Sequence, residues 1–77
     1  MELKLRMDSS SCEDYILYYD NSGAIGFEAQ FDNYEFNGIV SFCKNIGDDE
    51  EIWYKVEDKD IYCFIKDKAI EDFNKIQ

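Results

Sequence analysis

The sequence predicts a small α+β fold, in one domain over residues 1–77. We expect an antiparallel sheet of five to six short strands, or a partly open barrel, with a C-terminal helix packed on one face. Two observations predict this fold. Apolar residues recur at every second position over most of the chain, which is typical of half-buried strands. In the last eleven residues the apolar spacing changes to three and four, which indicates a helix with one apolar stripe.

Turn residues divide the alternating part into segments of strand length. Asp20-Asn21-Ser22-Gly23 predicts a turn, because Asn and Gly tolerate left-handed backbone angles. Asn37-Gly38 predicts a type I′ hairpin, which needs positive φ at both central residues. A change of apolar parity near Asp32-Asn33 predicts a bulge or a short loop. We expect the five to six strands to form from the segments 2–7, 15–19, 25–31, 34–36, 39–43, 52–56 and 60–66.

The C-terminal segment is predicted to be a helix that begins after Asp67, a residue type that favours the N-cap position. Glu71 and Lys75 are four residues apart and would form a weak supporting pair. A helix with one apolar stripe must bury that stripe against another element, so we expect it to cross the sheet. The stripe consists of Ala69, Ile70, Phe73 and Ile76.

Cysteine usage and hydropathy indicate a compartment. Cys12, Cys43 and Cys63 are an odd and widely spaced set, whereas a disulfide scaffold has an even and denser one. Cys43 and Cys63 lie in apolar runs, where a free cysteine behaves as a small hydrophobe. The first residues lack the apolar run of a signal peptide, and no apolar stretch has membrane length. We therefore expect a cytoplasmic protein without membrane contact.

Enzymatic chemistry is not expected, nor is a cofactor. The chain has no histidine, no glycine-rich phosphate loop and no Gly-x-Ser-x-Gly motif. A calcium loop alternates its ligands and has glycine at its sixth position. Residues 48–51 are instead contiguous acids, and Asp20-x-Ser22-Gly23 places its glycine too early. We expect no metal site, and a calcium-responsive module is retained only as a third alternative.

The charge is the strongest functional signal. The net charge is −10, and residues 7–43 contain seven acids and no lysine or arginine. Such a field repels nucleic acid and attracts basic surfaces, and a surface kept merely soluble mixes both signs. Trp53 is more typical of a core edge, although tryptophan also favours interfaces. The candidate partner-binding residues are Asp48, Asp49, Glu50, Glu51, Trp53, Glu57, Asp58, Asp60, Glu28, Asp32 and Glu35.

These observations favour a small acidic binding protein that docks on a basic surface of a nuclease or another nucleic-acid-processing protein and inhibits it. Its carboxylates would imitate a row of phosphates, with the acids of 48–51 and 57–60 at opposite ends of a hairpin formed by 52–56 and 61–65. Phage inhibitors of defence nucleases and immunity proteins of nuclease toxins share this charge and size. The alternative is a homodimeric structural or accessory domain whose acids serve only solubility.

Overall fold

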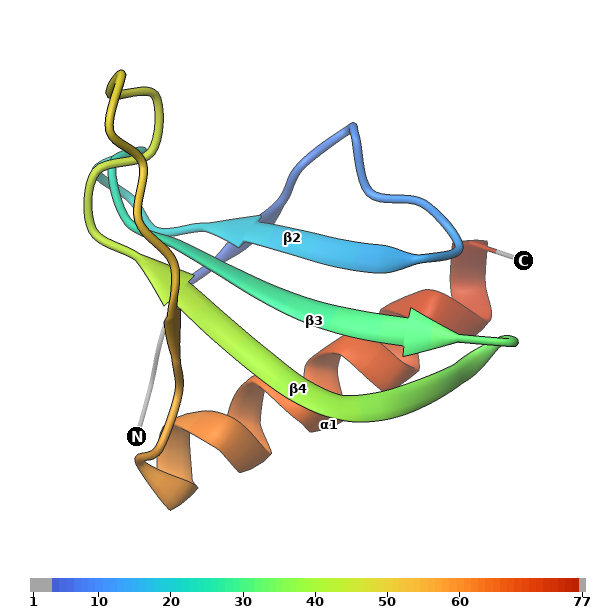
Figure 1. The fold of residues 1–77 in the computed structure, drawn as a ribbon. Coiled ribbons are helices and arrows are strands. Elements are labelled where there is room, and N and C mark those ends of the chain that lie inside the picture. The colour runs from blue at the N-terminus through green and yellow to red at the C-terminus, as the bar shows by residue number, and fades with distance from the viewer. Residues whose placement is uncertain (1–3, 77) are drawn as a thin grey trace.

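The computed structural model describes residues 4–76 and contains a five-stranded antiparallel sheet with one helix across a single face (Figure 1). The sheet is an open meander, because its strands neighbour one another in chain order. The α+β class predicted from the sequence is thus confirmed, as an open sheet. The elements are β1 (Arg6–Met7), β2 (Tyr15–Tyr19), β3 (Gly26–Asp32), β4 (Glu35–Cys43), β5 (Tyr54–Lys55) and α1 (Lys59–Ile76).

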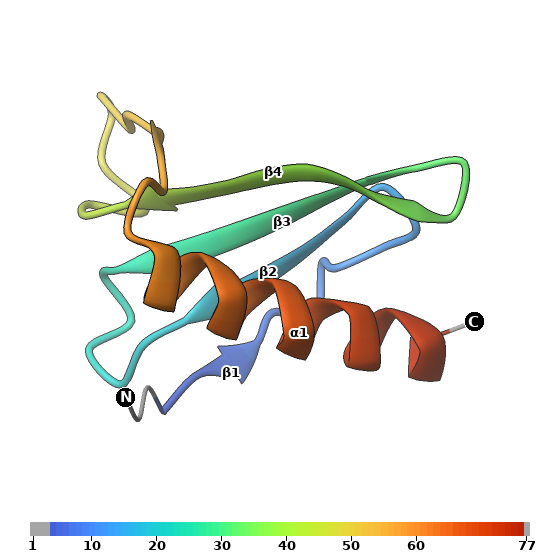
Figure 2. The same cartoon turned by 90° about the horizontal axis from the view of Figure 1, so that it is seen from below.

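The core lies between the sheet and α1. Antiparallel pairing places Ile16 opposite Ala29 and Tyr18 opposite Phe27, so their side chains share the face that the helix covers. Figure 2 shows α1 running along this face. Burial of each large apolar side chain contributes about 1.5–3 kcal/mol, and the strands in isolation would not be stable. The core consists of Ile16, Tyr18, Phe27, Ala29, Phe31, Val40, Val56, Ile65, Ala69 and Phe73.

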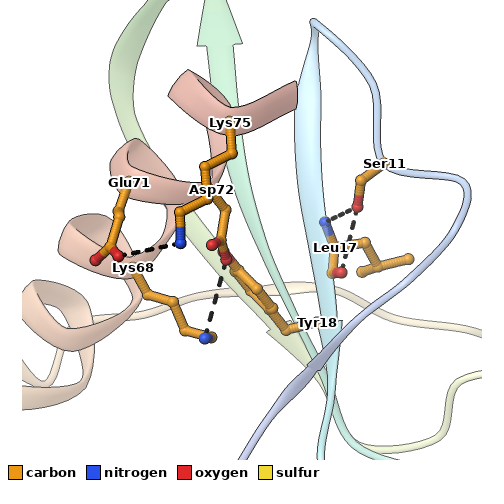
Figure 3. A network of polar contacts seen from close by, with 7 residues as sticks. All are labelled: Ser11, Leu17, Tyr18, Lys68, Glu71, Asp72 and Lys75. Atoms are coloured by element: carbon orange, nitrogen blue, oxygen red, sulfur yellow. Dashed lines mark hydrogen bonds and ion pairs between the residues drawn. The ribbon is translucent and has the colours of Figure 1, made fainter. Parts of the chain in front are cut away.

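A polar contact inside this core fixes the helix against the sheet (Figure 3). The Tyr18 side chain is fully buried, and its hydroxyl donates to Asp72 Oδ2 at 2.6 Å. Lys68 Nζ lies 3.9 Å from the same oxygen and 5.4 Å from the centre of the Tyr18 ring. Burial and the Asp72 carboxylate raise the pKa of Tyr18, so the phenol remains a neutral donor. A buried hydroxyl needs such a partner, and this one specifies the position of α1.

The predicted hairpin at Asn37-Gly38 is wrong: the chain reverses four residues earlier. Asn33 and Tyr34 have φ of 50° and 67°, the positive pair that a type I′ turn requires. The strands on either side pair Asp32 with Glu35. The change of parity near Asp32-Asn33 therefore marked the turn itself. β4 then continues through Asn37-Gly38 without a break.

Gly38 serves a bulge inside β4. Phe31 pairs with Phe36 and Ala29 with Val40, so β4 carries extra residues opposite Gln30. Gly38 adopts φ of 94° there, which glycine accepts without strain. The Asn37 side chain accepts from the backbone N–H of Ile39 at 3.0 Å, and the Tyr62 hydroxyl donates to the Gly38 carbonyl at 3.1 Å. Both bonds occupy backbone or side-chain groups along the free edge of β4.

The expected strand 60–66 is also wrong, because α1 already begins at Lys59. Asp58, not Asp67, caps the helix: its Oδ1 accepts from the backbone N–H groups of Asp60 and Ile61 at 2.9 and 3.0 Å. The apolar stripe extends backwards from Phe73 through Ala69 and Ile65, at intervals of four residues. Residues two apart therefore point in different directions, and Cys63 is exposed although it lies in an apolar run of the sequence.

Two expected strands are shorter in the structure. Of the described residues 4–7, only Arg6–Met7 form β1, and Glu2 and Leu3 of the expected strand lie outside the described residues. Of residues 52–56 only Tyr54–Lys55 form β5. The connection between β4 and β5 rises on the face opposite the helix, and the chain then returns past β4 through β5 to reach α1 (Figure 1). Ile46 in this connection packs directly on Gly26, so that a Cβ there would require the Ile46 side chain to move. The helix ends at Ile76, and Gln77 is outside the described residues.

Candidate functional site

Four carboxylates gather where β3 turns into β4. Asp32 and Glu35 are directly opposite in the ladder. Glu13 and Asp14, from the loop before β2, line a hollow of about 190 Å³ together with Asp32. The backbone N–H of Phe31 donates to the Asp14 carbonyl at 2.8 Å, which holds the loop beside the hairpin. We call this cluster of Glu13, Asp14, Asp32 and Glu35 the acidic hairpin end.

The turn at the acidic hairpin end presents an aromatic side chain. Tyr34 is 64% exposed and lines the same hollow as Asn33. Its φ of 67° is unusual for a bulky residue, since the second central position of this turn favours glycine. The left-handed conformation costs about 1–2 kcal/mol for a residue with a Cβ. Backbone strain of this kind concentrates at functional sites, so Tyr34 is a candidate contact residue.

No cation neutralises this end among residues 4–76. The two ion pairs in this part of the chain, Lys68 with Asp72 and Lys75 with Glu71, both lie within α1. Like charges placed directly opposite in a sheet are destabilising. The acidic hairpin end therefore has a local cost in stability that its own surroundings do not offset.

Residues 48–51 lie at the other end of the sheet, in the loop between β4 and β5. All four are exposed, and Glu51 has a local structural role. Its carboxylate accepts from the backbone N–H of Gly47 at 3.0 Å and from Trp53 Nε1 at 2.9 Å. These two hydrogen bonds lower the pKa of Glu51, and the bond from Gly47 has the larger effect. Trp53 is half-buried and held by this contact, while the Asp48, Asp49 and Glu50 side chains face solvent.

The acids 57, 58 and 60 lie at the start of α1. The hairpin that would have carried them at one end and residues 48–51 at the other does not form, because residues 61–65 are helical. The predicted hairpin with an acidic group at each end is therefore wrong. Asp58 is the helix cap, and Glu57 and Asp60 are exposed beside it. Acids at a helix N-terminus are favoured by the helix dipole, which gives this group a local explanation.

The third group of predicted acids is Glu28, Asp32 and Glu35, and the structure brings only two of them together. Asp32 and Glu35 face each other across the turn. Glu28 lies further along β3 on the face opposite the helix, where its carboxylate accepts from Gln30 Nε2 at 3.2 Å. Four residues of extended strand separate Glu28 from Asp32, roughly 13 Å. Glu28 therefore flanks the acidic hairpin end and does not belong to it.

Three residues of this region are not among those predicted from the sequence, namely Glu13, Asp14 and Tyr34. Tyr34 was assigned to a strand because Asn37-Gly38 is the stronger hairpin signal. The parity change at Asp32-Asn33 was the available sign of the turn. Nothing local in the sequence links Glu13 and Asp14 to Asp32, since only the pairing of β2 with β3 brings them together.

Other acids outside the acidic hairpin end accept hydrogen bonds from neighbouring turn or strand residues. Asp20 accepts from the Ser22 hydroxyl and from the backbone N–H of Gly23 and Ile25, and these bonds lower its pKa, with Ser22 contributing most. Asp8 accepts from Ser10 and Tyr19 hydroxyls, and its pKa is lowered for the same reason. Such acids need no further explanation.

Within the described part of the chain, no three carboxylate or thiol groups come close enough to share a metal ion. Between residues 4 and 76, no helix has both the length and the apolar character needed to cross a bilayer. The cysteines of this part are free thiols, with Cys43 buried, Cys12 half-buried and Cys63 exposed. Comparisons with protein-family models, with curated proteins and with solved structures gave no match to this chain.

Proposed function

We propose that this chain is a binding protein that docks its acidic surface on a basic surface of a nucleic-acid-processing protein and inhibits it. The supporting observation is the acidic hairpin end, where four acidic residues lie at one end of the sheet and none forms an ion pair with the described residues. A basic partner would neutralise the charge that this end leaves uncompensated.

Tyr34 gives this surface an anchor. Tyrosine is enriched among residues that dominate binding energy, because it is large, rigid and amphipathic. At 64% exposure, its ring stands among the carboxylates that would steer a basic partner toward it. The aromatic ring also accepts a guanidinium over its face, so arginine suits both parts of the site.

The spacing of the acids fits two basic patches better than one continuous track. Glu35 is the first residue of β4 and Cys43 is the last. The loop that carries the acids 48–51 follows Cys43. Eight steps of about 3.3 Å give roughly 26 Å between the two ends. Duplex DNA carries one charge per roughly 1.7 Å of axis, so a nucleic-acid channel offers cations over such a distance. The protein would occupy that channel through its two acidic ends.

The alternative of a homodimer paired through a sheet edge receives less support from the geometry. β1 and β5 are two residues long, and the free edge of β4 is interrupted by the Gly38 bulge. The Asn37 side chain and the Tyr62 hydroxyl occupy groups along that edge. Short and bulged edges oppose strand addition.

A capture experiment tests the proposal. Tagged protein would be incubated with a lysate of its source cells, washed at low and at high salt, and the retained proteins identified by mass spectrometry. We expect a basic nucleic-acid-binding protein that is released as salt rises and that a DNA or RNA duplex displaces. A retained protein that neither salt nor nucleic acid displaces would contradict the proposal.

A matched pair of charge reversals locates the surface. Asp32→Lys with Glu35→Lys changes the acidic hairpin end, and Asp67→Lys with Glu71→Lys makes the same change of charge on exposed positions of α1. We expect the first pair to weaken binding by about tenfold or more, and the second to have a much smaller effect. Equal effects would mean that only net charge matters, and the acidic hairpin end would not be the site.

A further inference from the structure

An apolar groove opens where α1 begins. Its walls come from the turn before β3, from β3, from the end of β4, from the segment after β5 and from the first turn of α1. Its volume is about 480 Å³, within the range of sites that bind small molecules or side chains. We call it the helix-start groove; its walls are Ile25, Phe27, Phe42, Val56 and Ile61.

The groove exists because the helix seals the sheet only from its second turn onward. The buried helix residues are Ile65, Ala69 and Phe73, whereas Ile61 in the first turn is half-buried. Beyond Ile61, the apolar face of the sheet continues with Phe42 and Tyr54, whose ring centres are 5.6 Å apart. The Tyr54 residue is 51% exposed. The sheet therefore offers more apolar surface at this end than α1 covers.

Charged groups at the rim select the occupant. Glu57 and Asp58 are exposed on the helix side and Lys44 on the strand side. Asp58 uses Oδ1 to cap the helix, which leaves Oδ2 available to accept a bond from a ligand. The rim thus carries two acids and one base within a chain of net charge −10. An apolar group next to a cation fits this arrangement, and an apolar group next to an anion does not.

We propose that the helix-start groove receives an apolar side chain of the basic partner, flanked by arginine or lysine that pairs with Glu57 and Asp58. This inference rests on the proposed function and adds an anchor to it. The acidic surface would steer association and make it sensitive to salt. The groove would supply apolar burial, which rising salt does not weaken. The complex should then keep a salt-resistant part of its affinity.

Three short peptides test this inference with the chain as it is. The first has one leucine between arginines, the second replaces the leucine by alanine, and the third places the leucine between glutamates. Binding would be followed by backbone amide NMR shifts at low and at high salt. We expect the first peptide to bind, with shifts at Phe42, Val56 and Ile61, and the alanine peptide to bind about tenfold more weakly at both salts. The glutamate peptide should not bind.

Two isoleucines of α1 provide a matched pair of variants. Ile61→Ala removes a wall of the groove, while Ile70→Ala changes a helix residue that does not line it. We expect Ile61→Ala to remove the preference for leucine over alanine and Ile70→Ala to preserve it. A melting curve followed by circular dichroism would show that both variants are folded.

The outcomes separate the two proposals. Equal binding of the leucine and alanine peptides, or shifts confined to the acidic hairpin end, would overturn the groove inference and leave the proposed function supported. Binding of the glutamate peptide in the groove would overturn the choice of a basic occupant. If none of the peptides binds, the groove inference is overturned, while the salt-sensitive capture of a basic partner still decides the proposed function.

Discussion

The two ends of the sheet hold their carboxylates in different ways. Where α1 begins, Asp20, Glu51 and Asp58 each accept two or more hydrogen bonds from nearby donors. At the acidic hairpin end, none of the four carboxylates takes part in an ion pair with the described residues. The first set stabilises turns and a helix cap, whereas the second set repels itself. Net charge alone does not separate these two uses of an acidic residue.

The two ends of the sheet also differ in their backbone conformation. Turns at the first end are closed by Asp and Ser side chains, and Gly23 takes the positive φ there. At the acidic hairpin end the positive φ falls on Tyr34. One end therefore follows the local preferences of its residues, and the other departs from them. Such departures are expected at sites that meet a partner.

The largest effect is expected from Phe73→Ala. Phe73 stacks on Phe31 with ring centres 4.1 Å apart, and Phe31 immediately precedes the acidic hairpin end. Truncation should lower the free energy of unfolding by about 3–5 kcal/mol. Amide exchange at Asp32 and Glu35 should accelerate more than exchange in the loop at the other end. Urea denaturation and hydrogen exchange measure both quantities.

Phe64→Ala is the control for this change, because Phe64 is a helix residue that is only partly buried at the edge of the core. It should cost clearly less than Phe73→Ala. If the two variants lose equal stability, the stacked pair does not hold the hairpin, and the two ends do not differ in their dependence on α1.

Tyr34→Gly should have the next largest effect, with opposite signs for stability and binding. Glycine relieves the left-handed conformation, worth about 1–2 kcal/mol, and loses about 0.5–1 kcal/mol through its greater freedom in the unfolded chain. We expect a net gain near 0.5–1 kcal/mol in urea denaturation. Partner affinity should fall, because the exposed ring is removed. A loss of stability would show that Tyr34 supports the fold, and would remove the argument from strain.

A pair of aspartate substitutions compares the two ends directly. Asp58→Ala removes the acceptor of two N–H groups at the helix start and should cost about 1 kcal/mol. Asp32→Ala removes one of two opposed carboxylates and should leave stability unchanged or raise it by about 0.2–1 kcal/mol. Thermal unfolding of both variants at low salt measures the difference. The same sign for both would contradict the distinction between the two ends.

Local patterns predicted much of the sheet. The alternation of Phe27, Ala29 and Phe31 predicted β3 and its buried face, and residues 15–19 form β2 as expected. Two competing patterns misled the rest. Asn37-Gly38 carries a strong hairpin signal, but its glycine is needed for a bulge. The spacing of Ile61 and Ile65 is compatible both with the two-residue period of a strand and with the four-residue spacing of a helix. The Asp58 cap is the local feature that favours the helix.

The candidate site was predictable in its charge and not in its position. The segment without bases, residues 7–43, spans β2, β3 and β4, which carry the acidic hairpin end. Which of their carboxylates meet depends on the register, since Asp32 faces Glu35 only if the chain turns at Asn33. Residues 48–51 are more conspicuous in the sequence, yet nothing packs them into a cluster with 57–60. Pairing between distant segments determines such a site, and a local pattern does not contain it.

The smallest expected effect is the pH response of the loop at the groove end. Hydrogen bonds from Gly47 and Trp53 lower the pKa of Glu51 below its ordinary value of 4.5. A lowered folded-state pKa means that the contact contributes fully above that ordinary value and is lost as pH falls through the lower one. Trp53 is the only tryptophan, so its fluorescence reports this loop alone. We expect its emission to change with a midpoint below pH 4.5, and Glu51→Gln to abolish that transition. A midpoint at or above 4.5 would mean that Glu51 is not held in this contact in solution, and its use as a structural acceptor, on which the contrast between the two ends depends, would fail there.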